Sequence, residues 1–368
     1  MTSGINKSRI GPDYAPEPPP ASNSAPRYVI FFTGLTAAAS AILAAAYLIV
    51  SDRTAWGEFL TIWPPVLWLF GLLPLALLSC HRRRGRLGVL AFACPILFLA
   101  LAGEWRSLVN LVYFAPEAPF VLQVGTWNMG SGYSDSTKQL REMAAHEVDL
   151  WLLQETPDHS DAFSSETLTQ AGLAGFHAID AGDCAVLSRW PVRRLESQRV
   201  GPWEAPLAVA VDLSASRTLV VVNARLMLPS LELNPFSSRA RDRLAADHAQ
   251  RIAQFPRLVE LANRHAEKEN AQAAIVGGDF NTPGRMWSVR APLRGAGFRD
   301  VWREAGAGWP GTMTADFPVA RIDQLWARGA LRPTLARVHP ADGLSDHRPL
   351  LAELAWEGET SASPAPQR

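Results

Sequence analysis

Residues 273–281 read Ala-Ala-Ile-Val-Gly-Gly-Asp-Phe-Asn, an apolar run that passes directly into polar residues. The length and composition of this run predict a β-strand buried on both faces, with Asp279 and Asn281 just beyond it. Residues 150–155, Leu-Trp-Leu-Leu-Gln-Glu, follow the same pattern and end in Glu155. Two carboxylates therefore stand at the ends of two predicted buried strands.

Short apolar runs of this kind recur through the C-terminal two thirds of the chain. They predict strands at 120–127, 150–153, 184–187, 207–213, 218–222, 273–276, 322–326 and 350–356. Apolar residues at helical spacing predict helices at 136–148 and 237–268. Many strands and few helices in about 250 residues predict an α/β domain with two packed β-sheets flanked by helices.

Charge and cysteine content exclude several classes of site. The 368 residues hold 35 Lys and Arg against 35 Asp and Glu, but 26 basic and 30 acidic residues follow Phe114. A mildly acidic domain argues against a broad basic face for long nucleic acid, because phosphate neutralisation provides most non-specific affinity. This part contains one cysteine, Cys184, which excludes a disulfide or a cysteine-rich zinc site within it.

Three apolar stretches before Phe114 predict membrane-spanning helices. Residues 28–50 and 59–79 contain no charged residue, and each exceeds the ~18 residues that mark a spanning helix. The third stretch, 87–105, is uncharged only up to Ala102, which corresponds to about 24 Å of helix. It therefore spans only if its last residues lie at the membrane interface.

The distribution of arginines predicts the orientation of these helices. Four arginines lie at 82–86, whereas the loop at 51–58 contains one. Since positively charged residues collect on the cytoplasmic side, the segment 28–114 is expected to start inside and deliver the domain at 115–356 to the extracytoplasmic side of the cell membrane. Without the third crossing, that domain would be cytosolic. The Pro-rich residues 1–27 and the tail 357–368 are expected to be disordered.

Polar residues mark the ends of further predicted strands. Asn128 follows the first strand, Arg321 and Asp323 flank Ile322, and Asp346 precedes His347 before the last strand. A single residue of this kind more commonly hydrogen-bonds the backbone of a turn. The repetition of the pattern favours one shared site.

The chemistry of these groups favours a hard divalent cation. A carboxylate such as Glu155, attached to an apolar strand, loses hydration and needs a cation or donors to keep its charge. Oxygen ligands without thiolates suit Mg²⁺, with Mn²⁺ as the alternative, better than zinc. His347 adds a group that titrates near neutrality, and Asp323 could hold its ring. The adjacent Asp346 is a poor partner because neighbouring side chains diverge on an extended chain.

Five motifs resemble those of the endonuclease/exonuclease/phosphatase superfamily, which has the DNase I-like fold. They are Thr126-Trp127-Asn128, Leu153-Gln154-Glu155, Gly278-Asp279-Phe280-Asn281, Arg321-Ile322-Asp323 and Ser345-Asp346-His347-Arg348-Pro349. Their order and spacing also match, and the resemblance extends over residues 120–356. It implies a four-layer α/β/β/α sandwich built on two mixed sheets, and the hydrolysis of a phosphate ester.

The resemblance also implies roles for individual residues. The implied metal ligands are Glu155, Asn128 and Asp346. The implied catalytic residues are His347, Asp279, Asp323 and Asn281. Whether Asp279 or His347 moves the proton stays open at this point. Asn281 is also expected to donate a hydrogen bond to the phosphate or the nucleophile.

One position departs from the family pattern. In the strand that contains Asn223, histidine commonly follows two residues after the asparagine, and this chain has Arg225 there. The planar guanidinium group favours bidentate contact with phosphate, so Arg225 and Asn223 are predicted to bind substrate. An exposed strand-end cation without a function is the alternative for Arg225.

The sequence thus predicts a multi-pass membrane protein that hydrolyses a phosphodiester with Mg²⁺. Nucleic acid, a phospholipid headgroup and a soluble phosphate ester are all compatible substrates, because the motifs describe the reacting phosphate and not its substituents. The expected partners are this substrate and the bilayer, with no protein partner. The alternative is a membrane module of the same fold that binds phosphate without hydrolysing it. Arg225, at the position where histidine is common, is the reason to consider this alternative.

Overall fold

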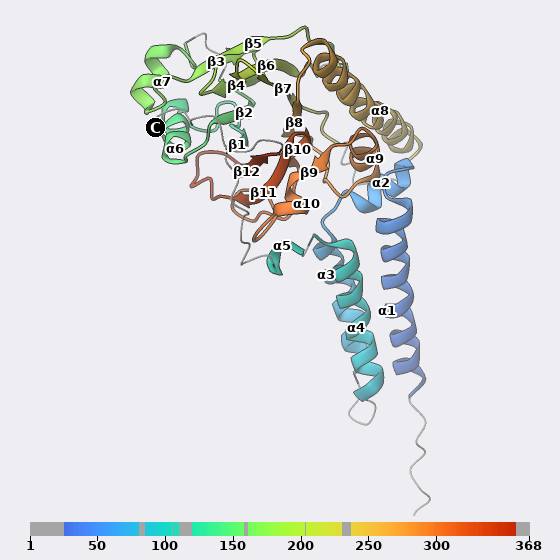
Figure 1. The fold of residues 1–368 in the computed structure, drawn as a ribbon. Coiled ribbons are helices and arrows are strands. Elements are labelled where there is room, and N and C mark those ends of the chain that lie inside the picture. The colour runs from blue at the N-terminus through green and yellow to red at the C-terminus, as the bar shows by residue number, and fades with distance from the viewer. Residues whose placement is uncertain are drawn as a thin grey trace, which may run out of the picture.

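The computed structural model describes residues 26–80, 85–104, 106–109, 120–157, 161–202, 204–229 and 237–357. The expected N-terminal tail up to residue 25, the arginines at 82–84, Trp105 and the tail from residue 358 lie outside these ranges. Within the described residues, a mixed α/β domain carries helices at its N-terminal side. Figure 1 shows helices α1 and α4 extending from the domain in a common direction.

Two six-stranded sheets form the centre of the domain. The first has the order β11 (Leu331–Val338), β12 (Leu350–Trp356), β1 (Val121–Asn128), β2 (Leu150–Gln154), β4 (Cys184–Ser188) and β3 (His177–Asp180). The second has the order β5 (Val192–Arg194), β6 (Leu207–Ser214), β7 (Arg217–Arg225), β8 (Ala273–Asp279), β10 (Asp323–Gly329) and β9 (Arg299–Asp300). Only the β1–β2 and β7–β8 neighbours are parallel among these described strands, so both sheets are mixed.

The apolar faces of the sheets pack against each other. Leu152 of the first sheet and Val221 and Ile275 of the second belong to one fully buried cluster. Strands whose residues are buried on both faces lie in the centre of each sheet, which explains why β2, β4 and β8 read as continuous apolar runs. The parallel β7–β8 pair is joined by a helical crossover, as a parallel connection requires.

Helices cover the outer faces of both sheets. Helices α6 (Ser136–Ala145) and α7 (Ser165–Ala171) contribute to a buried cluster with the first sheet. Helices α8 (Ser238–Lys268) and α9 (Trp287–Gly295) do the same with the second sheet. The predicted α/β/β/α sandwich is therefore confirmed.

The strands that the sequence did not predict lie mainly at sheet edges. The structure contains all eight predicted strands, and adds β3, β5, β9 and β11. Strands β11 and β3 form the two edges of the first sheet, and strands β5 and β9 form the two edges of the second sheet. Edge strands lack a continuous apolar run because one side faces solvent, and β11 also contains Pro333.

The N-terminal helices match the predicted spans in two of three places. The α1 segment continues into a π-helical turn, so Arg27–Val50 is one helix, and α4 covers Gly85–Ala102. Both are long and apolar enough to cross a membrane. The stretch at 59–79 differs: α2 (Ala55–Thr61) and the helix at Pro65–Leu78, which includes α3 (Leu69–Leu78), meet at 80°. Pro64 and Pro65 lie at this bend, where they interrupt helical hydrogen bonding.

The N-terminal helices contact the domain through buried polar groups. Glu58 of α2 pairs with Arg251 and, at 2.5 Å, with His248 Nδ1, both on α8. Beyond these, Arg285 Nη2 donates to the carbonyl oxygens of Thr61 and Trp63, each at 2.7 Å.

The chain segment after α4 makes another such contact. Glu104 accepts two hydrogen bonds from Arg321, at 2.9 Å from Nε and 2.7 Å from Nη2. Arg321 also pairs with Asp300 at 2.9 Å, and its side chain is almost fully buried. Buried ion pairs at two places, Glu58 and Glu104, therefore join the N-terminal segment to the domain.

We expect Glu58→Ala to lower the free energy of unfolding by about 3–5 kcal/mol, because it leaves Arg251 buried without its carboxylate partner. The measurement is thermal unfolding of the full-length protein in detergent, where the melting temperature should fall by about 10 °C. Glu260→Ala is the matched control, since it breaks an exposed pair with Arg264 and should cost less than about 1 kcal/mol. Equal melting temperatures for both variants would contradict this role of Glu58.

Candidate active site

The polar residues at the strand ends meet at one edge of the sandwich. Asn128 ends β1, and Glu155 follows β2, which runs parallel to β1. Asp279 ends β8 opposite Arg225 of β7, and the antiparallel strand β10 begins at Asp323 opposite Asp279. Parallel pairing within each sheet and the packing of the two sheets thus bring these residues together.

Asn128 links carboxylates from the two sheets. Its Nδ2 donates to Glu155 Oε1 at 2.9 Å and to Asp279 Oδ2 at 3.0 Å. Its Oδ1 accepts a hydrogen bond from the backbone N–H of Gly130 at 2.9 Å, which fixes the orientation of the amide. The predicted proximity of Asn128 and Glu155 is present in the structure.

Glu155 is more accessible than Asp279. Its side chain is 26% exposed, whereas Asp279 is 1% exposed as a residue. The backbone of Glu155 has a φ of 46°, in the left-handed region that costs a residue with a side chain about 1 kcal/mol or more. Arg225 Nη2 lies 2.9 Å from Glu155 Oε1. The strained backbone thus holds a partly exposed carboxylate next to the guanidinium group of Arg225.

His347 and Asp323 form a buried pair. His347 Nδ1 lies 2.9 Å from Asp323 Oδ2, and Asp323 is fully buried. Burial lowers the pKa of His347, but the charge and hydrogen bond of Asp323 outweigh it and raise the pKa to about 10. His347 is therefore a protonated donor at neutral pH, and the pairing expected from the sequence is present.

Asp279 is part of the same cluster. One ligand atom each of Asp279, Asp323 and His347 lies within 4.8 Å of the others. Burial and then the charge of Asp323 raise the pKa of Asp279 to about 7, although His347 opposes the shift. A carboxyl group that titrates near neutrality is suited to accept or donate a proton. Asp279, Asp323 and His347 therefore form one buried acid–base group, whose ligand atoms are also close enough to share a metal ion.

Asp346 lies next to Gly130. Its Oδ1 would be 3.1 Å from a Cβ added to Gly130, which places the carboxylate beside the turn that follows β1. Ser345 fixes this loop, because its Oγ donates to the carbonyl oxygen of Asn128 at 2.7 Å. Asp346 is therefore in the region expected for it.

The structure gives Asn223 a different role from the predicted one. Asn223 is fully buried, and its Nδ2 donates to the carbonyl oxygens of Leu153 and Ala185 at 2.7 and 2.9 Å. Its Oδ1 accepts from Gln154 Nε2 at 2.7 Å. The side chain therefore joins the two sheets below the site and does not bind substrate, because all its polar atoms have internal partners.

Asn281 is held close to Asp279. Its backbone N–H donates to Asp279 Oδ1 at 2.9 Å, and its Nδ2 donates to the carbonyl oxygen of Leu226 at 2.8 Å. The residue has a φ of 47°, as Asn tolerates better than most residues. Asn281 therefore shapes the loop that holds Asp279, and one proton of its amide is committed to the backbone.

Sequence reasoning missed one residue that contacts this site and the role of another that lies two residues from it. Asp183 pairs with Arg225 at 3.5 Å, and both side chains are partly exposed. Arg321 was quoted as part of a motif without a role, but it is buried and paired with Asp300 and Glu104 two residues before Asp323. The position of Asp183 directly before the apolar run at β4 is the same signal that identified Glu155.

The donor set fits a hard divalent cation. Glu155, Asp279 and Asp346 supply carboxylates and Asn128 supplies an amide around one edge, and oxygen ligands of this kind suit Mg²⁺. Asp323 Oδ1 is buried without a hydrogen-bond partner among the described residues, so acceptor capacity remains in the cluster. Glu155 and Asn128, with Asp346 beside them, would hold the ion, and Asp279 lies next to them through its hydrogen bond with Asn128.

Comparison with protein families gives one match. The profile of the Endonuclease/Exonuclease/phosphatase family matches residues 125–347, more than half of the chain. No curated protein matches the chain. The match begins within β1 and ends at His347, so it contains all the candidate catalytic and metal-binding residues.

Solved structures show distant similarity. An endonuclease/exonuclease/phosphatase from Beutenbergia cavernae is 19% identical, with 65% of this chain and 72% of that chain covered and a TM-score of 0.46. The catalytic domain of human Nocturnin is 15% identical, with coverage of 67% and 98% and a TM-score of 0.47. The mannosyl-6-phosphatase of Bacteroides thetaiotaomicron is 15% identical, with coverage of 64% and 100% and a TM-score of 0.46.

Proposed function

Because the chain belongs to the endonuclease/exonuclease/phosphatase family, whose members hydrolyse phosphoesters, we propose that it is a Mg²⁺-dependent phosphodiester hydrolase. The observation that carries this proposal is the hydrogen-bonded connection from Glu155 through Asn128 to Asp279. It joins an accessible carboxylate to a buried acid–base group, from two different sheets. Metal-assisted attack of water on a phosphate needs both parts in one place.

The residues of this edge have complementary charges for the reaction. Hydrolysis increases the negative charge on the non-bridging and leaving oxygens, so donors that face them stabilise the transition state more than the substrate. His347 is the proposed donor to the phosphate, because Asp323 keeps its ring oriented and protonated. Arg225 is the proposed second donor, through the bidentate contact that a guanidinium makes with oxyanions.

Asp279 is the proposed base. Its pKa of about 7 allows the carboxylate to take a proton from water at neutral pH. Asn128 and the backbone N–H of Asn281 orient its two oxygens, at 3.0 and 2.9 Å. This assignment gives the proton transfer to Asp279 and the electrostatic stabilisation to His347, the choice that the sequence left open.

A divalent cation held by Glu155, Asn128 and Asp346 would neutralise the phosphate and orient it. We propose Mg²⁺, with Mn²⁺ as the alternative, because the donors are oxygen atoms.

We also propose that the N-terminal helices anchor the enzyme in the cell membrane. The two helices that could span a bilayer, and a third span if the bent pair crosses, support this placement. With three crossings and an inner N-terminus, the active site faces the extracytoplasmic side. A reporter fused after the C-terminus should be active only outside the cytoplasm, and cytoplasmic activity would refute the three-crossing arrangement.

The test of the function is a substrate screen with the full-length protein in detergent. The substrates are bis-p-nitrophenyl phosphate, DNA, RNA, phospholipids and p-nitrophenyl phosphate, each with Mg²⁺ and with EDTA. We expect metal-dependent cleavage of at least one diester, and slower cleavage of the monoester. Cleavage of monoesters alone would replace the phosphodiesterase proposal by a phosphatase.

A phosphate-binding module without turnover is the second candidate. The ion pair between Arg225 and Glu155 favours it, since it engages the carboxylate that would bind the metal. Saturable phosphate binding without cleavage of any substrate in the screen would support this candidate over the enzyme.

We expect Arg225→Ala to lower kcat/KM for bis-p-nitrophenyl phosphate about 10- to 100-fold, since a hydrogen bond to a charged group contributes about 1.5–3 kcal/mol. Arg225→Lys should retain part of the activity, because it keeps the charge but not the planar fork. Steady-state kinetics at fixed Mg²⁺ provide the measurement. Activity of Arg225→Ala equal to that of the wild type would assign Arg225 to the exposed strand-end alternative.

A further inference from the structure

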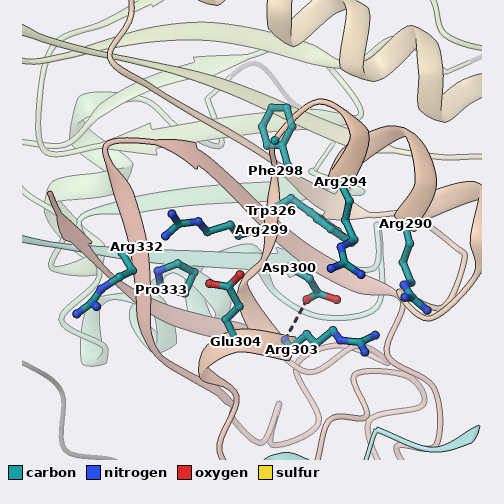
Figure 2. Close-up of a pocket in the computed structure, with 11 residues that line it drawn as sticks. Arg290, Arg294, Phe298, Arg299, Asp300, Arg303, Glu304, Trp326, Arg332 and Pro333 are labelled. Carbon is teal, nitrogen blue, oxygen red and sulfur yellow. Dashed lines mark hydrogen bonds between the residues drawn. The ribbon is translucent and has the colours of Figure 1, made fainter.

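A second concave site lies away from the candidate active site. A cavity of about 560 Å³ is formed by α9, β9, α10 (Val301–Ala305) and β11. None of the candidate catalytic or metal-binding residues is among those that line it. Five arginines do line it, and Figure 2 shows their side chains around the cavity: Arg290, Arg294, Arg299, Arg303 and Arg332.

The positive charge of this cavity is not balanced from within. Only two acidic residues line it, and one of them, Asp300, is already paired with Arg321 at 2.9 Å. In the described part of the chain, no ion pair joins Arg290, Arg294 or Arg303 to an acid. Burial, and then repulsion by Arg303 and Arg294, lowers the pKa of Arg290. The guanidinium groups are therefore close enough to repel one another.

Buried donors at this site also lack acceptors. Arg290 Nε and Trp302 Nε1 have no hydrogen-bond partner among the described residues, and neither does Arg285 Nε. An unsatisfied buried donor costs about 1–3 kcal/mol, so native structures rarely retain one without a function. All three residues line this cavity or the one next to it. A bound oxyanion would supply the acceptors that these groups lack.

The cavity continues toward the apolar helices. Arg290 and Arg303 also line a neighbouring cavity of about 310 Å³, whose other walls include Tyr47, Leu48 and Ala102. These three residues belong to the ends of the two helices that could span a membrane. Figure 1 shows α9 and α10 on the side of the domain from which α1 and α4 extend.

We propose that the arginine cavity binds the phosphate headgroup of an anionic membrane lipid. Clustered guanidinium groups bind phosphate oxygens in bidentate geometry, and the adjoining cavity places the acyl chains beside α1 and α4. A free phosphate ester shares the phosphate chemistry but would leave the apolar side without a partner. The proposal rests on the proposed membrane insertion, and it is independent of the hydrolytic reaction.

The test is a binding titration of the full-length protein in a neutral detergent. The probes are dioctanoyl phosphatidic acid, dioctanoyl phosphatidylcholine and inorganic phosphate, followed by isothermal titration calorimetry. We expect phosphatidic acid to bind saturably and about tenfold or more tightly than either other probe, since it alone combines a net negative headgroup with acyl chains. Inorganic phosphate that binds as tightly as phosphatidic acid would overturn the lipid assignment in favour of a soluble ester.

Two double variants test the site itself. Arg294→Gln with Arg303→Gln removes two exposed arginines of the cavity, and should weaken phosphatidic acid binding about tenfold or more. Arg141→Gln with Arg194→Gln removes the same charge from exposed positions that do not line the cavity, and should bind as the wild type does. If both double variants bind phosphatidic acid equally weakly, or if the first binds it as the wild type does, the arginine cavity is not the binding site.

Hydrolysis serves as a separate readout for the same proteins. The Arg294→Gln and Arg303→Gln variant should cleave bis-p-nitrophenyl phosphate at the wild-type rate, because neither residue contacts the candidate active site. A wild-type protein that binds phosphatidic acid but cleaves nothing would refute the proposed function and leave the lipid site in place.

Discussion

Glu155→Ala should reduce Mg²⁺-dependent hydrolysis of bis-p-nitrophenyl phosphate by about a thousandfold, a loss of several kcal/mol of transition-state stabilisation. Glu155 is a partly exposed carboxylate of the site, and its left-handed backbone shows that the fold tolerates strain to place it there. The measurement is kcat/KM over a range of Mg²⁺ concentrations. Treatment of the wild type with EDTA should cause a loss of similar size, which Mg²⁺ reverses.

The structure offers a control for this variant. Glu166 is an exposed carboxylate on α7, and Glu166→Ala should leave the dependence on Mg²⁺ unchanged. If Glu155→Ala retains metal-dependent activity, the ion is held elsewhere, and the buried trio of Asp279, Asp323 and His347 becomes the first alternative.

His347→Ala should lower kcat about 10²- to 10⁴-fold, the range that a positioned acid–base residue contributes. The substitution removes the protonated donor and leaves Asp323 fully buried without its partner. Single-turnover hydrolysis at saturating substrate separates this effect from substrate binding. Asp323→Asn should also slow the reaction, because the neutral amide no longer keeps the ring of His347 protonated.

His177→Ala is the corresponding control, since His177 is exposed on the edge strand β3. Thermal unfolding of each variant separates lost chemistry from lost folding. An active His347→Ala protein with normal stability would remove His347 from the reaction and leave Asp279 as the sole acid–base residue.

The sequence predicted the site because its residues occupy strand ends. A run such as Ala273–Val276 marks a central strand, and the acid that follows it must emerge at an edge of the sheet. Antiparallel pairing of β10 with β8 then brings Asp323 beside Asp279, as the register shows. Position along the strand therefore carries most of the information about which acids meet.

The features that could not be predicted from the sequence are side-chain contacts that depend on packing between distant segments. Asn223 lies on a strand like the other polar residues, but its amide points between the sheets and bonds to the backbone of β2 and β4. No pattern in the sequence distinguishes a side chain directed inward from one directed at a ligand. The partner of Arg321 is likewise 217 residues away, at Glu104.

The bend between α2 and the following helix is a different case. Pro64 and Pro65 are visible in the sequence, and a proline pair disfavours a continuous helix. Hydropathy alone counts the stretch at 59–79 as one span, because these two prolines lower the mean hydropathy of the stretch only slightly. Adding backbone hydrogen bonding to the hydropathy argument would have located the break.

The buried ion pairs made by Glu58 and Glu104 have a practical meaning for protein production. A truncated form that starts at β1, designed to be soluble, would lose both acids. Arg251 would then lack its carboxylate partner, and Arg321 would keep only Asp300. Arg321 stands two residues from Asp323, so we expect such a truncation to disturb the candidate active site and to expose new apolar surface. A soluble form of this protein should therefore retain the N-terminal segment up to Glu104, or carry acidic replacements for Glu58 and Glu104.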